Sequence, residues 1–241
     1  MTHLQDQHII VVGGSSGIGL AVAATALRAG ARVSIMARSR ARLDRARQQL
    51  DAGDALQTVA VDVTDESTVQ LAFAGLPAPD HVHVSAAGFV GGSVLGTPMT
   101  ELRAALDARL WGAVHVVRAA APRMTAGGSF VLTGGISTER PAKGAWPTAV
   151  ATAAAEQLAR CLALELAPLR FNAIAPGWTD TPMWDGLLGA SKADTFAAVA
   201  GRTPTGRLVT ADEAAQAVLL LMSNASLNGE ILHIDGGLRL A

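Results

Sequence analysis

The stretch GGSSGIG, residues 13–19, follows directly on the apolar run HIIVV, residues 8–12, and leads into a helical pattern from about residue 18. Its glycines let the backbone turn tightly and approach a pyrophosphate, and the start of a helix supplies N–H groups and partial positive charge for that anion. The spacing is not GxGxxG and no GK[ST] follows, which argues against a nucleoside triphosphate loop. We therefore predict a dinucleotide site formed here by Gly13, Ser15, Ser16, Gly17, Ile18 and Gly19.

Short apolar runs alternate with helical stretches along the whole chain. The expected strands are 8–12, 32–37, 56–61, 81–86, 128–133, 169–175 and 230–235, and the expected helices include 100–120, one that begins near 144, and 211–222. Apolar strands joined through helices form a parallel sheet that is covered on both faces. We predict an α/β chain: one domain over residues 1–241, with a doubly wound Rossmann fold of about seven parallel strands and helices on both faces.

The longest stretch expected to be irregular is about 177–206, which begins where a strand ends and is rich in Gly, Pro, Thr and Trp. Loops at the carboxyl ends of parallel strands commonly shape ligand sites. We therefore expect this segment to be the substrate loop.

Composition limits the partners. Nineteen basic and 20 acidic residues give no electrostatic attraction to nucleic acid or to an anionic membrane, so a small molecule is the expected substrate. The chain has one cysteine, no membrane-spanning apolar run and no signal-peptide pattern at its start, and these features predict a cytoplasmic protein. Cys161 is expected to be buried or to lie in an interface.

The second expected strand ends at Ala37 and is followed by Arg38. A protein that selects a free ribose 2′-hydroxyl places an acid here, whereas arginine suits a 2′-phosphate. Arg38 therefore favours NADP(H). The neighbouring arginines at 40, 42, 45 and 47 are interpreted mainly as solvated surface charges.

These motifs together resemble the short-chain dehydrogenase/reductase family, and the resemblance extends over essentially the whole chain. By this resemblance, Asp62 and Val63 contact adenine, and Ser85–Gly88 follows the fourth strand at the cofactor, which adds Ala87 and Gly88 to the site. The segment that holds the nicotinamide carboxamide in that family corresponds to Pro176, Gly177, Thr179 and Thr181. The family further implies a homodimer or homotetramer formed through helices 100–120 and 148–166.

The family's chemistry depends on Asn, Ser, Tyr and Lys, and the resemblance aligns Arg109, Gly135, Thr148 and Thr152 with these positions. A threonine hydroxyl cannot replace tyrosine as a general acid, because its pKa lies far above the working range. Arg109 can polarise a carbonyl but cannot shuttle protons. We expect atypical or much reduced hydride transfer. The alternatives are a catalytically silent nucleotide-binding or interaction protein, or a non-redox lyase or isomerase that uses the same cavity.

Other polar side chains receive structural interpretations. Ser137, Glu139 and Lys143 are expected on a solvated loop that rims the pocket, and His81 and His83 on one face of a strand edge without a metal. His115 is expected in packing or an interface. Trp146, Trp178 and Trp184 are expected either to line the substrate side or to fill the core.

Overall fold

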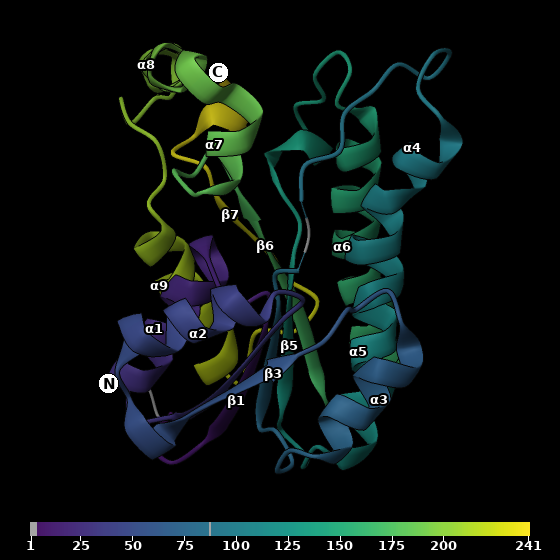
Figure 1. Ribbon diagram of the computed structural model, residues 1–241, viewed down its shortest axis with the longest axis vertical. Helices are drawn as coiled ribbons and strands as arrows, with labels where there is room; N and C mark the ends of the chain where they lie inside the picture. Colours follow the sequence, from purple (N-terminus) through teal and green to yellow (C-terminus); the bar gives the residue numbers. More distant parts are fainter. Residues whose placement is uncertain (1–3, 87) are drawn as a thin grey trace.

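The computed structural model describes residues 4–86 and 88–241 and shows a seven-stranded parallel sheet (Figure 1). The strand order is β3-β2-β1-β4-β5-β6-β7. The strands are β1 His8–Val12, β2 Arg32–Ala37, β3 Leu56–Ala60, β4 His81–Val84, β5 Ser129–Thr133, β6 Arg170–Pro176 and β7 Ile231–Ile234. Every neighbouring pair is parallel, so the predicted α/β Rossmann-like fold is confirmed.

Helices cover both faces of this sheet (Figure 1). One layer contains α1 Gly17–Arg28, α2 Arg40–Leu50 and α9 Ala211–Ser223. The other contains α3 Glu66–Ala74, α4 Met99–Leu106, α5 Gly112–Ala120 and α6 Trp146–Glu165. Within the described residues, no helix is long and apolar enough to cross a membrane.

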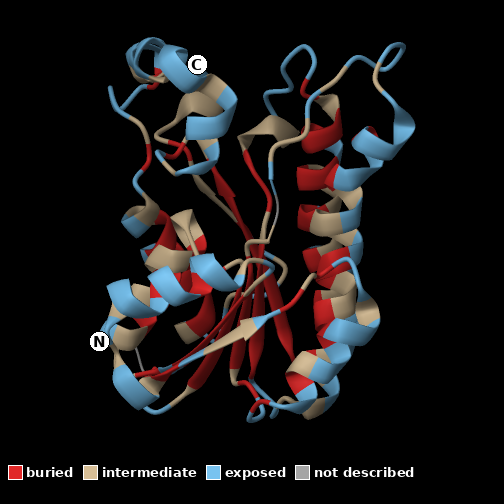
Figure 2. Ribbon diagram, in the orientation of Figure 1, coloured by how far each residue is buried: buried red, intermediate tan, exposed pale blue. Residues whose placement is uncertain are grey.

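The core consists of two apolar layers, one on each face of the sheet (Figure 2). Neighbouring strand residues alternate between them: Ile10 packs in the layer under α5 and α6, and Ile9 in the layer under α1 and α9. Phe130 and Phe171 stack in the first layer with ring centroids 4.6 Å apart. Alanines at a four-residue spacing let α6 approach the sheet closely, and they are Ala151, Ala155, Ala159 and Ala163.

The expected helix 100–120 is interrupted. A π-helical segment, η2 Asp107–Trp111, separates α4 from α5 and carries Arg109. Such segments are local insertions in an α-helix and occur often at functional sites. The apolar spacing alone could not reveal this change of pitch.

The prediction that 177–206 is irregular is wrong. The segment contains α7 Met183–Leu188 and α8 Lys192–Arg202, joined by the short turn η5 Gly189–Ser191. Glycine and proline at its turns obscured the two helices in the sequence. In Figure 1, α7 and α8 lie above the carboxyl ends of β6 and β7.

His81 and His83 lie in β4, which is a central strand and not an edge. His81 is hydrogen-bonded to Ser129 and Gln7, and His83 Nδ1 donates to the carbonyl of Val131 at 2.9 Å. No metal-binding group of His, Cys, Asp or Glu is found among residues 4–86 and 88–241. The two histidines are buried in the sheet, where they form hydrogen bonds to neighbouring residues.

Candidate functional site

A cleft of about 270 Å³ opens at the carboxyl ends of the strands. The chain reverses its order across the sheet between β1 and β4, and ligands of doubly wound proteins bind at such a point. The cleft brings together twelve of the residues predicted for the site: Gly13, Ser16, Gly17, Ile18, Arg109, Gly135, Thr148, Thr152, Pro176, Gly177, Thr179 and Thr181. Residues far apart in the sequence thus meet in one place.

The glycine loop is shaped for close backbone contact with a ligand. Gly13 has φ +89°, and a Cβ atom there would lie 2.7 Å from the amide nitrogen of Ala86. A Cβ on Gly19 would lie 2.3 Å from the carbonyl oxygen of Gly13. Helix α1 begins at Gly17, and the Ser16 side chain makes no capping bond within the described residues. The loop therefore fits a diphosphate at the N-terminus of a helix.

Several predicted cofactor residues lie outside the cleft. Arg38 is exposed immediately after β2, and the Asp62 carboxylate after β3 accepts bonds from Thr64 N at 3.0 Å and Thr64 Oγ1 at 2.8 Å. Ser15, Gly19, Val63 and Gly88 also do not line the cleft. Ala87 lies outside the described residues.

The segment after β6 forms the opposite wall. A Cβ on Gly177 would lie 2.8 Å from the Cα of Asp235, so only glycine fits there. Thr179 is buried, and its hydroxyl donates to the carbonyl of Gly177 at 3.1 Å. Thr181 packs against Gly17, since a Cβ atom on Gly17 would lie 3.2 Å from Thr181 Cγ2. The wall and the glycine loop thus meet at these two residues.

The Thr148 hydroxyl is fully engaged by backbone. It accepts from Val90 N at 2.8 Å and donates to Val90 O at 2.9 Å. A hydroxyl has a single proton, and here that proton is directed at a carbonyl. Thr148 therefore anchors the segment after β4 to α6, and in this arrangement it does not offer a proton to the cleft.

Thr152 lies at the centre of a group of hydroxyls. Its Oγ1 donates to Ala149 O at 2.8 Å and lies 3.1 Å from both Ser137 Oγ and Thr138 Oγ1. Gly135 stands beside this group, and a Cβ built on it would lie 3.9 Å from Ser137 Oγ. Ser137, expected to be a solvated loop residue, is half-buried and brings a hydroxyl close to the space a side chain at 135 would occupy.

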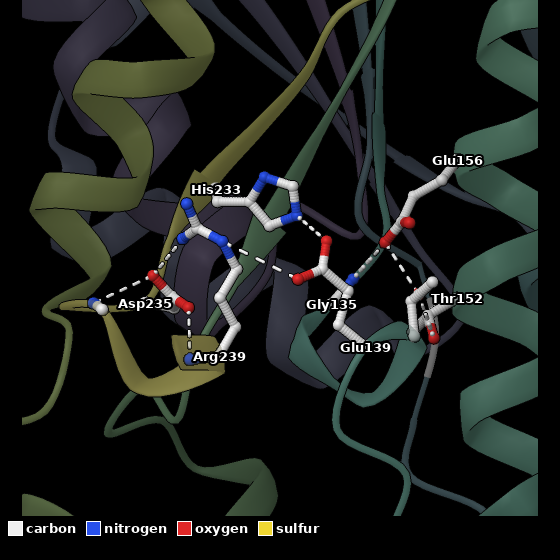
Figure 3. Close-up of polar contacts among 9 residues, drawn as sticks. Gly135, Glu139, Thr152, Glu156, His233, Asp235 and Arg239 are labelled. Atoms are coloured by element: carbon white, nitrogen blue, oxygen red, sulfur yellow. Dashed lines mark hydrogen bonds and ion pairs between the residues drawn. The ribbon is translucent and has the colours of Figure 1, made fainter. Parts of the chain in front are cut away.

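Glu156 is the residue that the sequence interpretation missed (Figure 3). It is only 5% exposed, and its Oε1 accepts bonds from Gly135 N at 3.0 Å and Thr138 Oγ1 at 2.9 Å. The signal was present, because Thr148, Thr152 and Glu156 follow each other at a four-residue spacing and so share one face of α6. A carboxyl group on the buried face of an alanine-rich helix requires partners.

Arg109 extends from the π-helical segment to the end of β5. Its Nη1 donates to Thr133 O at 2.8 Å and to Gly134 O at 3.2 Å. Desolvation lowers the pKa of Arg109 to about 10, while the negative charge of Glu156 raises it. The guanidinium therefore stays protonated at neutral pH and brings a fixed positive charge to the cleft.

Aromatic side chains form the outer wall of the cleft. Trp178 and Trp184 stack with centroids 4.2 Å apart, and Phe196 meets both rings edge-on. Lys192 braces this wall through bonds to Asp180 and Asp185 at 2.8 and 2.7 Å. Trp178 and Trp184 line the cleft, as one of the two expectations for them required. Trp146 does not line the cleft, and its indole nitrogen is buried without a partner among the described residues.

The remaining polar residues near the rim have structural contacts. Glu139 is exposed but pairs with His233 at 2.9 Å and Arg239 at 3.7 Å, and Arg239 also holds the buried Asp235 (Figure 3). Lys143 is exposed, as expected. His115 Nδ1 donates a hydrogen bond to the carbonyl oxygen of Val63 at 2.8 Å.

Comparisons with known proteins agree with this geometry. Residues 12–239 match the family model described as enoyl-(acyl carrier protein) reductase. A short-chain dehydrogenase/reductase of Acremonium is 31% identical, over 99% of this chain and 97% of the relative. The MalC reductase/Diels-Alderase structure from Malbranchea aurantiaca has a TM-score of 0.92 and 25% identity, and covers 99% of this chain and 98% of its own.

A second solved structure is also similar. An NADPH-bound short-chain oxidoreductase from Pseudomonas aeruginosa, described as containing an atypical catalytic centre, has a TM-score of 0.87 and 29% identity. The alignment covers 97% of this chain and 98% of that protein. With the family model matched over nearly the whole length, the chain belongs to the short-chain dehydrogenase/reductase family of NAD(P)-dependent oxidoreductases.

Proposed function

We propose that this protein is an NADP(H)-dependent oxidoreductase that reduces a small carbonyl compound, or oxidises the alcohol, slowly and without a tyrosine–lysine pair. When bound, the cofactor supplies or accepts hydride. The observation that carries the proposal is the cleft itself, in which the glycine loop, Arg109 and the hydroxyls of Ser137 and Thr152 face one space. The similar Pseudomonas protein, with NADPH and an atypical catalytic centre, supports it.

The proposed cofactor site combines five segments of the chain. The loop from Gly13 to Gly19 holds the diphosphate, Arg38 binds the 2′-phosphate, and Asp62 with Val63 contacts the adenine. The segment after β6, with Pro176, Gly177, Thr179 and Thr181, holds the carboxamide. Ala87 and Gly88 complete the site by the family resemblance.

The proposed chemistry uses charge and one hydroxyl. The guanidinium of Arg109 stabilises negative charge that develops on the carbonyl oxygen, and Ser137 donates a hydrogen bond in place of the side chain absent from Gly135. A well-matched general acid contributes on the order of 10²–10⁴ in rate, so turnover is expected to be slow and confined to electrophilic carbonyls. Gly135, Thr148 and Thr152 occupy the positions assigned to the family's serine, tyrosine and lysine.

Binding and turnover test the proposal separately. NADPH binding, followed by nucleotide fluorescence, is expected to weaken at least tenfold in R38A and to change little in R45A, which removes an exposed arginine on the following helix α2. NADH binding is expected to be the same in both variants. NADPH oxidation is then measured with a panel of diketones and quinones against an enzyme-free control.

Two alternatives have distinct outcomes in this assay. Tight NADPH binding without reduction of any carbonyl would favour a silent nucleotide-binding or interaction protein, a role consistent with the engaged hydroxyl of Thr148. Conversion of substrate without NADPH consumption would indicate a lyase or isomerase. Either result would refute the oxidoreductase assignment.

A further inference from the structure

We propose that the Glu156 carboxylate is the proton acceptor when this protein oxidises the alcohol, and that it acts through a chain of three hydroxyls, from Ser137 to Thr152 to Thr138, that opens into the cleft. The inference rests on the proposed function and names the group that takes the place of the missing acid–base residue. Glu156 acts through other residues, so its role is that of a positioning and proton-accepting residue.

The first step is that the carboxyl group is buried and built into the site. Glu156 is 5% exposed. Its side chain fills the space beside Gly134, where a Cβ atom would lie 2.2 Å from Oε1. Gly135 N and Thr138 Oγ1 hold the same oxygen (Figure 3). Burial of a carboxyl group is costly unless the group is hydrogen-bonded, and these two bonds keep it in one orientation.

The second step is that the hydroxyls are continuous. Oε1 of Glu156 lies 2.9 Å from Thr138 Oγ1, which lies 3.1 Å from Thr152 Oγ1, which in turn lies 3.1 Å from Ser137 Oγ. Every hydroxyl both donates and accepts, so protons can move along the chain by concerted rotation. Ser137 and Thr152 line the cleft, whereas Glu156 and Thr138 lie behind it.

The third step is the balance of the reaction. As the alcohol carbon gives up hydride to the oxidised cofactor, the electron pair of the breaking O–H bond forms the C=O π bond, and the proton of that bond passes to Ser137. Ser137 gives its own proton to Thr152, Thr152 gives one to Thr138, and Thr138 gives one to the carboxylate oxygen of Glu156 to which it already donates. The resulting carboxylic acid releases the proton to water, and the positive charge of Arg109 favours the return to the carboxylate.

Thr148 also lies in the cleft, but its contacts exclude it from the chain of hydroxyls. Thr148 uses both its proton and its acceptor on Val90, so it is not part of this chain. Thr152 has the freedom that Thr148 lacks, because its proton can turn from Ala149 O to either neighbouring hydroxyl.

Kinetics with matched variants form the first test. In E156Q the amide can still accept from Gly135 N, but it cannot take up the proton, so kcat for alcohol oxidation is expected to fall at least a hundredfold while KM and NADPH affinity stay within about threefold. The control is E165Q, which removes an exposed carboxyl from the same helix. T138V breaks the chain with the carboxyl in place and is expected to lower kcat similarly, whereas T138S is expected to restore it.

The second test needs no cofactor. Infrared difference spectra of the apoprotein at neutral pH, wild type minus E156Q, are expected to show a carboxylate band, because a proton acceptor must be in that form. A carboxylic acid band in its place would overturn the relay.

The outcomes separate the two proposals. Wild-type protein that reduces no carbonyl and oxidises no alcohol refutes the oxidoreductase and the relay together. Active wild-type protein with E156Q or T138V at the same kcat refutes the relay alone. If E156Q does not fold, the pair T138V and T138S decides.

Discussion

The Glu156 side chain occupies the space that a side chain at position 134 would need. An alanine at 134 would place its Cβ 2.2 Å from Glu156 Oε1 and 2.5 Å from its Cγ. Overpacking of this kind costs about 1–3 kcal/mol, and we expect G134A to lower the free energy of unfolding by that amount, measured in urea.

A double-mutant cycle checks the cause. If the clash is with the Glu156 side chain, E156A is expected to relieve it, so the two changes together cost at least about 1 kcal/mol less than their sum. The control is G201A in α8, where a Cβ meets no atom within 4 Å and is expected to be neutral or stabilising. Strict additivity of G134A and E156A would rule out this packing relation.

At this scale the sequence predicted the residues that form the cleft better than the bonds within it. Motif spacing placed Gly13, Gly17 and Thr181 correctly around one space, because chain connectivity and the parallel sheet fix where those segments meet. It could not show that Thr148 is bound to Val90 or that Ser137 turns inward, since both depend on loop conformations. Glu156 was not predicted, because it lies one turn beyond the positions that the family resemblance assigns to catalysis.

The central strand β4 makes stability depend on pH. Burial lowers the pKa of His81 and of His83 from 6.5 to about 4. In the unfolded state each histidine binds a proton as the pH falls below 6.5, whereas in the folded state it stays neutral until about pH 4. The free energy of unfolding therefore decreases as the pH falls from 6.5 to about 4. Each histidine is expected to contribute about 3 kcal/mol to this loss.

The histidine prediction is tested with His83→Asn, in which the amide nitrogen can replace Nδ1 as donor to Val131 O. Urea unfolding between pH 7 and pH 4.5 is expected to show a shallower loss of stability in this variant than in wild type. The comparison uses only the pH dependence, since the substitution itself also changes packing. Parallel curves would show that His83 does not titrate as proposed.

The carboxyl end of α9 is held by a buried arginine. Arg170 in β6 donates from Nη1 to Leu221 O at 2.8 Å and to Leu227 O at 2.9 Å, and from Nη2 to Met222 O at 2.5 Å. A cation at a helix C-terminus satisfies unpaired carbonyls and opposes the helix dipole. R170M is expected to lower the free energy of unfolding by about 3 kcal/mol. The exposed Arg160 provides the control, and a loss as small as that of R160M would contradict the capping role.

The elements themselves were largely predictable, and the exceptions have physical causes. All seven strands were found, because buried parallel strands are short continuous apolar runs with few alternatives. The helices α7 and α8 were missed, since α7 has only six residues and α8 shows its apolar side mainly through Phe196 and Val199. The π-helical segment at Asp107–Trp111 changes pitch without a change in composition.

Across the whole molecule, one layer of helices leaves apolar side chains exposed. Trp111 is 53% exposed, Val150 48% and Leu164 84%, and all three lie on the helices η2 and α6. These helices belong to the layer of α3 to α6 on one face of the sheet (Figure 1). Exposed apolar groups gathered on one face indicate an interface between proteins. Cys161 lies three residues before Leu164 on α6 and is exposed, so the prediction that it is buried does not hold for the single chain.

We propose that a second copy of this chain covers this surface, as a homodimer or as part of a homotetramer. L164E is expected to reduce the mass measured by light scattering after size-exclusion chromatography, and to speed the reaction of Cys161 with a thiol reagent at least tenfold. L220E is the control, because Leu220 is 46% exposed on α9, in the helix layer on the opposite face of the sheet. A wild-type protein that elutes as a monomer and reacts at Cys161 as fast as L164E would show that this surface serves another purpose.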